Sequence, residues 1–182
     1  MPSRYISRDG GILADRFTDG PYIFQNVHTL GGAARHTAAH TALLRAAAKS
    51  LFGFDPEITA DDLRRRIARL TEACRMPSRV SVRAVVRLYP TGSIEIACDE
   101  PSIYAGYVLR SLRPDAICLR MAPPLPSLPT SAAEHTRLLA DTMARTRGAR
   151  TAILTDSDGT VISESAQPIF IVNGYTVSTP AV

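Results

Sequence analysis

The segment Thr151–Pro180 reads TAILTDSDGTVISESAQPIFIVNGYTVSTP and predicts short strands joined by tight turns. Two residue pairs in it, Asp158-Gly159 and Asn173-Gly174, accept the positive φ angles that tight hairpin turns require. Apolar residues precede and follow each turn, as expected of strands that pack on a core. The segment is therefore expected to fold as consecutive β-hairpins.

A helix and a linker are expected directly before these hairpins. Residues 131–147 show helical periodicity, and Gly148 provides a stop. Ser131 and Glu134 form a capping box, in which each side chain satisfies the exposed amide of the other residue. Residues 122–129 read APPLPSLP, and the prolines fix φ and remove hydrogen-bond donors. This stretch predicts an extended linker.

The N-terminal half predicts a sheet with two helices. Apolar residues alternate along the expected strands and recur at helical spacing along the expected helices. The strands are expected at residues 22–28, 79–89, 93–98, 104–109 and 116–120, and the helices at residues 33–52 and 59–75. Either Arg83 or Arg87 is expected to pair with Glu95 across two of these strands.

Three motifs occur in order along the chain. The first is Asp15-Arg-Phe-Thr-Asp-Gly20 followed by Phe24-Gln25. The second places His40, Leu44 and Ala48 on the first helix, and the third is Ile169-Phe170 followed by Gly174 and Thr179-Pro180. Together they resemble the class IV pyridoxal-phosphate enzymes, the family that holds the branched-chain aminotransferases and the aminodeoxychorismate lyases.

The resemblance implies an α/β (α+β) fold in two parts. It places a small α/β domain at residues 1–121, the Pro-rich linker at 122–130, and the helix and first hairpins of a fold-type-IV larger domain at 131–182. It covers nearly all of this chain but only about the first two thirds of the family's fold. Because four hairpin strands and one helix cannot bury both faces of a sheet, we expect a homodimer or a partner subunit that completes the larger domain.

The residues that pyridoxal-phosphate chemistry needs are largely replaced. That chemistry requires a lysine for the Schiff base, and Lys49 is the only lysine in the chain. The resemblance places the family's lysine near Thr130 or Glu134. It places the phosphate-binding arginine at Leu43, and Arg45 lies about 200° around the helix from there. No cofactor is therefore expected. Pyridoxal phosphate could be present only if it binds non-covalently.

Two functions of different classes follow from the resemblance. The first is a degenerate homologue that has lost standard pyridoxal-phosphate chemistry and acts as a small-molecule-binding or scaffold protein, as a dimer. The alternative is an enzyme that reuses the interdomain cleft for chemistry without pyridoxal phosphate, or one subunit of a split aminotransferase or lyase. A small-molecule ligand in the interdomain cleft is expected.

The candidate catalytic residues are His28 and Glu164. His28 lies on the strand that lines the substrate pocket in the family, at a position often held by arginine. A lone histidine on a half-buried strand is more often a hydrogen-bonded packing residue. The family's glutamate position falls on Ser163, and on Glu164 only if the loop is one residue shorter. The candidate substrate-binding residues are Tyr22, Phe24, His36 and Tyr104.

Bulk composition excludes several classes. The net charge of +4 comes from arginines spread over every expected element, so no nucleic-acid interface is expected. No apolar run is long enough to span a membrane, and the three cysteines lack metal-ligand spacing. His36 and His40 are spaced i, i+4, but no third ligand is evident, so no metal site is expected. We expect a cytoplasmic protein with reduced thiols.

Overall fold

The computed structural model describes residues 5–14, 16–30, 32–79, 81–99, 115–125, 128–164 and 169–180. The chain divides into two compact units, Met1–Tyr107 and Val108–Val182. The mixed α/β architecture confirms the predicted fold class. None of the helices in the described ranges is long and apolar enough to cross a membrane.

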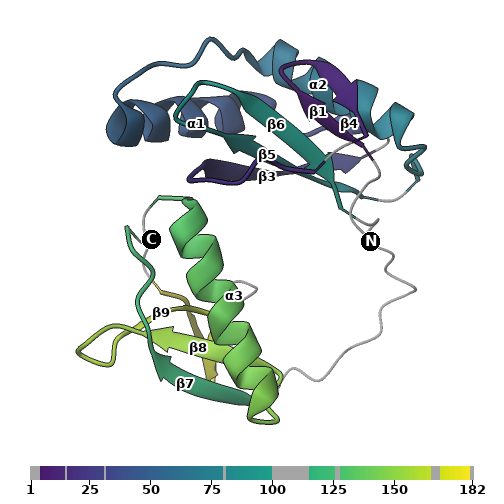
Figure 1. Cartoon of the computed structure of the whole chain (residues 1–182). Coiled ribbons are helices and arrows are strands. Elements are labelled where there is room, and N and C mark those ends of the chain that lie inside the picture. Colours follow the sequence, from purple (N-terminus) through teal and green to yellow (C-terminus); the bar gives the residue numbers. More distant parts are fainter. Residues whose placement is uncertain are drawn as a thin grey trace. The chain divides into compact units, whose positions relative to one another are not determined.

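The first unit is built on a six-stranded antiparallel sheet, coloured purple to teal in Figure 1. Its neighbouring strands run in the order β2-β1-β6-β5-β3-β4. The strands are β1 (Ile6–Arg8), β2 (Gly11–Leu13), β3 (Ile23–Leu30), β4 (Ala33–Ala34), β5 (Arg83–Leu88) and β6 (Ile94–Cys98). The predicted strand at residues 104–109 lies outside the described residues.

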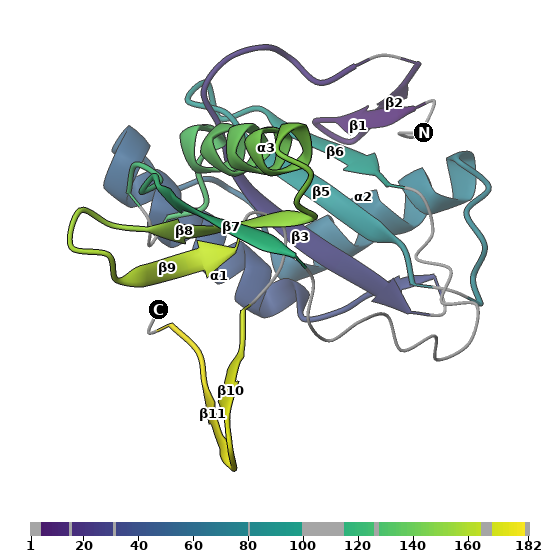
Figure 2. The same cartoon turned by 90° about the horizontal axis from the view of Figure 1, so that it is seen from below.

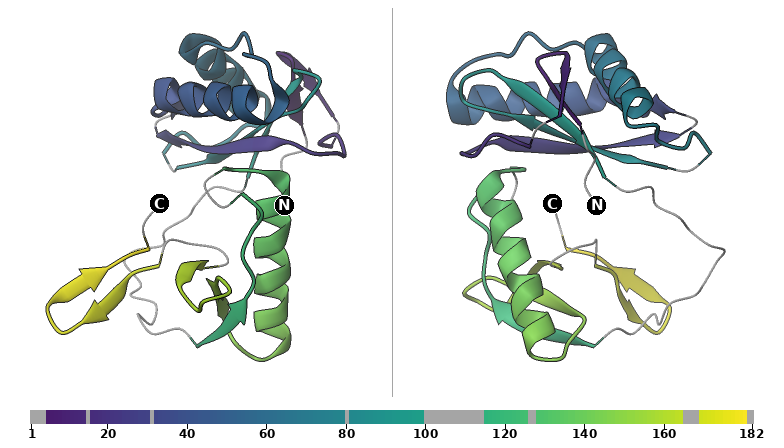
Figure 3. Two further views of the ribbon diagram at one scale, coloured as in Figure 1. Left: turned by 90° about the vertical axis from the view of Figure 1, so that its left-hand side faces the viewer. Right: turned by 45° about the vertical axis from the view of Figure 1, so that its right-hand side comes forward.

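Two helices, α1 (Thr37–Phe52) and α2 (Ala60–Ala73), cover one face of this sheet, as the two views of Figure 3 show. The β5 side chains on that face, together with Val82 just before it, are at most 1% exposed: Val82, Ala84, Val86 and Leu88. They pack with helix residues that are fully buried, namely Leu44, Leu63, Ile67 and Leu70. The predicted alternation along this strand and the predicted apolar stripe of the second helix are confirmed.

The helix ends follow from local chemistry. Thr59 is the N-cap of α2, since its hydroxyl accepts a hydrogen bond from the amide of Asp62 at 3.1 Å. Asp61 and Asp62 occupy the first turn, where the helix dipole favours negative charge. Gly53 ends α1 with φ 76°, a left-handed conformation that glycine adopts without strain.

The second unit contains a three-stranded sheet in the order β7-β8-β9, covered on one face by α3 (Figure 2). Strand β7 (Ala116–Arg120) runs parallel to β8 (Thr151–Thr155), and β9 (Val161–Glu164) runs antiparallel to β8. Helix α3 spans Ser131–Thr146. Their buried core consists of Leu119, Ala140, Ala144, Ala152 and Leu154.

The boundary between the two parts differs from the predicted one. Residues 116–121 and the Pro-rich stretch were assigned to the small domain and to a linker between domains. In the structure β7 pairs with β8, so both segments lie within the second unit. The reason is that parallel strands need a long crossover connection, which the Pro-rich stretch and α3 together supply.

A separate two-stranded hairpin follows, made of β10 (Ile171–Asn173) and β11 (Thr176–Ser178). Asn173 pairs with Thr176, so the two turn residues are Gly174 and Tyr175. The turn is therefore shifted by one residue from the predicted Asn173-Gly174. Gly174 has φ 58°, which meets the demand of a two-residue hairpin for a positive φ at its first position.

Candidate functional site

The candidate site is the face of the six-stranded sheet that neither α1 nor α2 covers. Side chains alternate across a sheet, so the residues between the buried ones point to this open face. Strand pairing places His28 opposite Arg83 and Phe24 opposite Arg87. Two arginines, a histidine and an aromatic ring thus share one surface of the first unit.

Arg87 is held between two aromatic rings. Its Cζ atom lies 4.0 Å from the centre of the Phe17 ring and 4.0 Å from that of the Tyr22 ring. Tyr22 in turn makes edge contacts with Phe24 at 6.4 Å and with Tyr89 at 5.9 Å between ring centres. A guanidinium stacked on both sides has a fixed orientation.

A buried carboxylate, Glu95, anchors the loop that carries Phe17. Glu95 is 1% exposed, and Arg8 donates to its Oε1 atom at 2.5 Å. Thr18 donates from its hydroxyl to Oε1 at 2.6 Å and from its amide to Oε2 at 2.8 Å. The hydroxyl of Tyr89 lies 3.0 Å from Oε2.

These contacts shift two pKa values. Burial alone would raise the pKa of Glu95, but the hydrogen bonds from Thr18, Arg8 and Tyr89 outweigh it and lower this pKa. Burial, followed by the Glu95 carboxylate, raises the pKa of Tyr89 to about 12. Glu95 therefore stays ionised at neutral pH.

Strand pairing sets Arg87 directly opposite Glu95, as one of the two predicted alternatives requires. The salt bridge of Glu95 is made by Arg8, which lies 87 residues earlier in the chain. Arg83 forms its salt bridge with Asp99 instead. Glu95 thus has an arginine on each neighbouring strand, Arg8 on β1 and Arg87 on β5.

Three histidines gather near the start of α1. His40 Nδ1 lies 2.8 Å from the side-chain oxygen of Gln25. Burial lowers the pKa of His40, and the neighbouring His36 and His28 lower it further. His28 Nδ1 lies 3.3 Å from the Ser81 hydroxyl on the open face. In the described part of the chain, no three His, Cys, Asp or Glu residues form a cluster that could hold a metal ion.

The other predicted site residues are distributed as follows. The open face or its rim holds three of them, Tyr22, Phe24 and His28. His36 is exposed and lies directly before α1, with φ 53°. Tyr104 lies outside the described residues. Glu164 ends β9 in the second unit, where pairing sets it opposite Ile153 and sets Ser163 opposite Leu154. Sequence reasoning missed the role of Arg87, although the alternation of β5 had already placed it on the polar face.

The residues present do not fit the pyridoxal phosphate that the resemblance implies. Lys49, the only lysine in the sequence, is exposed in the last turn of α1. Leu43 is 55% exposed, and Arg45 forms a salt bridge with Asp55 at 2.5 Å. The pocket that Lys49 lines is formed by Ala42, Arg45, Ala46 and Asp55, none of them aromatic, and Arg45, two residues from Leu43, is already paired.

Thr130 has a structural role of its own. It is the N-cap of α3, and its hydroxyl accepts a hydrogen bond from the amide of Ala133 at 3.2 Å. The cap therefore lies one residue before the predicted Ser131, and Ala133 rather than Glu134 is its partner. A side chain used in this way serves to start the helix.

Comparison with known proteins gives the family. The profile of the Amino-transferase class IV family matches residues 25–182. A search of curated proteins found no significant match.

Several solved structures have the same fold. The branched-chain aminotransferase of Thermoproteus uzoniensis, solved with norvaline, is 21% identical with a TM-score of 0.73, over 98% of this chain and 68% of that one. The branched-chain aminotransferase of Escherichia coli is 17% identical with a TM-score of 0.72, over 98% and 68%. An aminotransferase of Brucella abortus, bound to pyridoxal phosphate, is 14% identical with a TM-score of 0.71, over 98% and 71%.

At these identities the structures establish the fold alone, and this chain spans about two thirds of their length. The family match covers most of the chain and agrees with the motifs around Phe24, His40 and Gly174. The chain therefore belongs to the Amino-transferase class IV family.

Proposed function

We propose that this chain is a pseudoenzyme of its family, which has lost standard pyridoxal-phosphate chemistry and binds a small anionic molecule. The single observation behind the proposal is the combination of an exposed Lys49 with the arginine-bearing open face of the first unit. Lys49 lies in the last turn of α1 and lines a shallow pocket with Arg45 and Asp55. Arg87 supplies positive charge on the surface where His28 and Phe24 also lie, whereas the charge of Arg83 there is balanced by Asp99.

The chemistry of this face favours a carboxylate or phosphate group. A guanidinium is planar and always charged, and it recognises such groups through paired hydrogen bonds. Stacking between Phe17 and Tyr22 holds Arg87 in one orientation, so little conformational entropy is lost when an anion binds. The aromatic cluster of Tyr22, Phe24 and Tyr89 is buried and supports the Tyr22 ring from behind. We place this activity in the cytoplasm, in a dimer or in a complex with a partner subunit.

The test of lost cofactor chemistry uses the purified protein and pyridoxal phosphate itself. The protein is incubated with a stoichiometric amount, reduced with borohydride and examined by peptide mass mapping, with Lys49→Arg as control. We expect no stoichiometric adduct and no amino-acid-dependent turnover. A stoichiometric adduct on Lys49 together with turnover, both lost in Lys49→Arg, would overturn the proposal.

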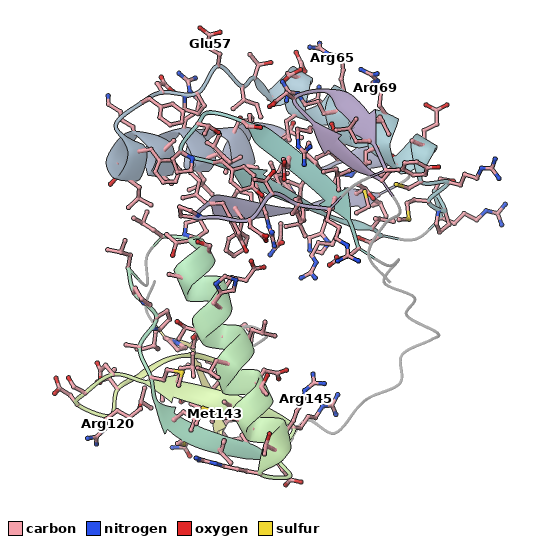
Figure 4. All side chains as sticks on the ribbon, viewed as in Figure 1. Glu57, Arg65, Arg69, Arg120, Met143 and Arg145 are labelled. Atoms are coloured by element: carbon pink, nitrogen blue, oxygen red, sulfur yellow. The ribbon has the colours of Figure 1, made fainter. Side chains whose placement is uncertain are left out.

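The test of anion binding combines native mass spectrometry with thermal shifts on a panel of carboxylates and phosphates. Arg87→Lys is expected to weaken binding about tenfold, because a paired hydrogen bond is lost. The matched control is Arg69→Lys, which makes the same change on α2, where Figure 4 shows Arg69 pointing away from the sheet. Equal weakening by both variants would contradict a site on the open face.

A second candidate function is an enzyme that uses this surface without pyridoxal phosphate. The observation that favours it is the 3.3 Å approach of His28 Nδ1 to the Ser81 hydroxyl, since a histidine can activate a hydroxyl held beside it. Glu164, on β9 in the second unit, remains a separate catalytic candidate from the sequence. Turnover of a bound ligand that disappears in His28→Gln, with binding retained, would favour this candidate. A protein that is stable and active only with a second polypeptide would indicate one subunit of a split aminotransferase or lyase.

A further inference from the structure

A cavity of about 430 Å³ lies at the C-terminal end of α2, in the first unit. On the sheet side it is lined by Thr29 of β3 and by Val82, which stands directly before β5. Both residues alternate with open-face neighbours, His28 and Arg83, so they belong to the face that the helices cover. The cavity is therefore separate from the anion site proposed on the open face. A volume of this size accommodates a small organic molecule.

Arg75 lines this cavity in a strained backbone conformation. Its φ angle is 51°, in the left-handed region that favours glycine. Arg75 directly follows the α2 C-cap, Cys74, and its amide donates to the Glu72 carbonyl at 2.9 Å. The next amide, that of Met76, donates to the Thr71 carbonyl at 2.9 Å, which completes a Schellman motif.

Glycine is the usual residue at this place in a Schellman motif. The other two described helices follow that rule, since Gly53 ends α1 and Gly148 lies just after α3, both with φ 76°. Arg75 departs from the rule where the chain borders a cavity. Non-glycine residues held in such conformations cluster at active sites and ligand-binding sites, so the strain points to a function of the Arg75 side chain.

Glu72 and Arg75 place opposite charges at this cavity. The arginines nearer the start of α2 are paired with Asp61 and Asp62. In the ranges that the structure describes, neither Glu72 nor Arg75 has such a partner, and they do not pair with each other. An anion beside Arg75 and a cation beside Glu72 are therefore both favoured. The cation is stabilised further by the carbonyl groups at the helix C-terminus, which carry partial negative charge.

The rest of the lining combines apolar surface with two buried hydroxyl groups. Thr29 and Thr71 are 2% and 7% exposed. The Thr29 hydroxyl accepts a hydrogen bond from the amide of Val82 at 3.2 Å. The Thr71 hydroxyl donates to the carbonyl of Ala68 at 2.8 Å. Among the described residues, Thr29 thus keeps a hydroxyl proton and Thr71 keeps lone pairs for a ligand. The apolar lining consists of Ala68, Met76, Pro77 and Val82.

We propose that this cavity binds a small zwitterion with an apolar body. Its carboxylate pairs with Arg75, and its ammonium pairs with Glu72 at the end of α2. Its apolar body lies against Met76 and Pro77. A guanidinium forms paired hydrogen bonds with a carboxylate, which explains why arginine stands here although glycine would be free of backbone strain. The site goes beyond the anion site on the open face, and neither site requires the other.

The test is isothermal titration calorimetry of the whole chain with three probes that each contain six carbon atoms. Norleucine and 6-aminohexanoate are isomeric zwitterions with adjacent and separated charges, and hexylamine lacks the carboxylate. At least one zwitterion is expected to bind at least about tenfold more tightly than hexylamine, because it adds a charged pair with Arg75. Failure of both zwitterions to bind, or equally tight binding of hexylamine, would overturn the proposal.

Arg75→Gly tests the site in a variant that folds at least as well as the wild type. Relief of the left-handed strain is expected to raise the midpoint of thermal unfolding by about 2 °C, while zwitterion binding is lost. Because the variant is more stable, its loss of binding cannot be assigned to unfolding. Zwitterion binding at wild-type affinity in Arg75→Gly would overturn the proposal.

Glu72→Gln tests the ammonium partner independently of the backbone strain. It is expected to weaken zwitterion binding about tenfold, because one charged pair is lost. The matched control is Glu57→Gln, which makes the same change in the loop before α2, where Figure 4 shows Glu57 pointing away from the sheet. Equal weakening in Glu72→Gln and Glu57→Gln would contradict the site. Loss of zwitterion binding in Arg87→Lys, with full binding in Glu72→Gln, would assign the probe to the open face and overturn this proposal alone.

Discussion

The guanidinium of Arg87 lies over the ring of Tyr22, with 4.0 Å between Cζ and the ring centre. Phe17 covers the other side of the same guanidinium at the same distance. Phe17 and Tyr22 belong to the segment before β3, whereas Arg87 belongs to β5. The stack therefore ties a loop to the open face of the sheet and fixes the direction of a charge there.

Replacing Arg87 by lysine should destabilise the first unit. An ammonium is a point charge that cannot stack as a plane between two rings. We expect the free energy of unfolding to fall by about 1–2 kcal/mol, because two cation–π contacts are weakened. Urea unfolding followed by circular dichroism measures this loss. The control is Arg83→Lys, whose exposed ion pair with Asp99 should contribute less than about 1 kcal/mol. Equal losses in the two variants would show that the stack does not stabilise the fold.

Glu95→Gln should change how stability depends on pH. The folded state lowers the pKa of Glu95, so the unfolded chain binds more protons in the acidic range. The stabilisation from this carboxylate is therefore fully present above its unfolded pKa and is lost as the pH falls through the lower folded value. We expect Glu95→Gln to cost about 1–3 kcal/mol at neutral pH, from the lost charged hydrogen bonds, and to flatten the acid side of the stability curve.

Unfolding of Glu95→Gln is measured from neutral pH down to acid pH, with Asp55→Asn as the control. Hydrogen bonding to Arg45 also lowers the pKa of Asp55, but this ion pair is exposed to solvent. The control should therefore follow the wild-type curve closely. An unchanged acid dependence in Glu95→Gln would mean that the buried network does not govern the pH response.

Much of the fold could be predicted because it depends on local patterns. Alternation along β5 identified the buried face of the strand, and helical spacing identified Leu63, Ile67 and Leu70 as core residues. The boundary of the second unit could not be predicted in this way. It depends on the parallel pairing of β7 with β8, two segments separated by about thirty residues of proline-rich chain and helix.

In the candidate site, too, local sequence patterns predicted some residues, whereas contacts between distant parts of the chain could not be predicted. Phe24 and His28 were assigned to one strand by the resemblance to the family's first hairpin, and the structure places both on β3. Local patterns predicted the cross-strand neighbour Arg87 of Glu95. They could not predict Arg8, which approaches Glu95 from a strand 87 residues away, or Thr18, which lies in a loop without a regular pattern. The stacking of Arg87 also depends on such a loop, since Phe17 lies outside any strand.

The three cysteines should react at very different rates with a thiol reagent. Burial, followed by the nearby Cys74 and Asp99, raises the pKa of the Cys98 thiol to about 12, and Cys98 is fully buried. Cys118 is exposed on β7. Since the thiolate is the reactive form, we expect iodoacetamide to modify Cys118 first and Cys98 only after unfolding. Peptide mass mapping over a time course measures the order. Rapid labelling of Cys98 in the folded protein would show that the core of the first unit opens readily.

Thr130→Ala should weaken the start of α3. The Thr130 hydroxyl satisfies the amide of Ala133, which has no partner within the helix, and the side chain is 8% exposed. Loss of an N-cap hydroxyl costs about 1 kcal/mol, so the urea midpoint of the second unit should fall accordingly. Thr130→Ser keeps the hydroxyl and removes only a methyl group, so it should restore most of this stability. If Thr130→Ser is as destabilising as Thr130→Ala, the residue acts through packing of its methyl group and not as the cap. A Thr130→Ala variant that is more stable than the wild type would contradict the capping role. The Thr130 hydroxyl would then serve something other than the stability of α3.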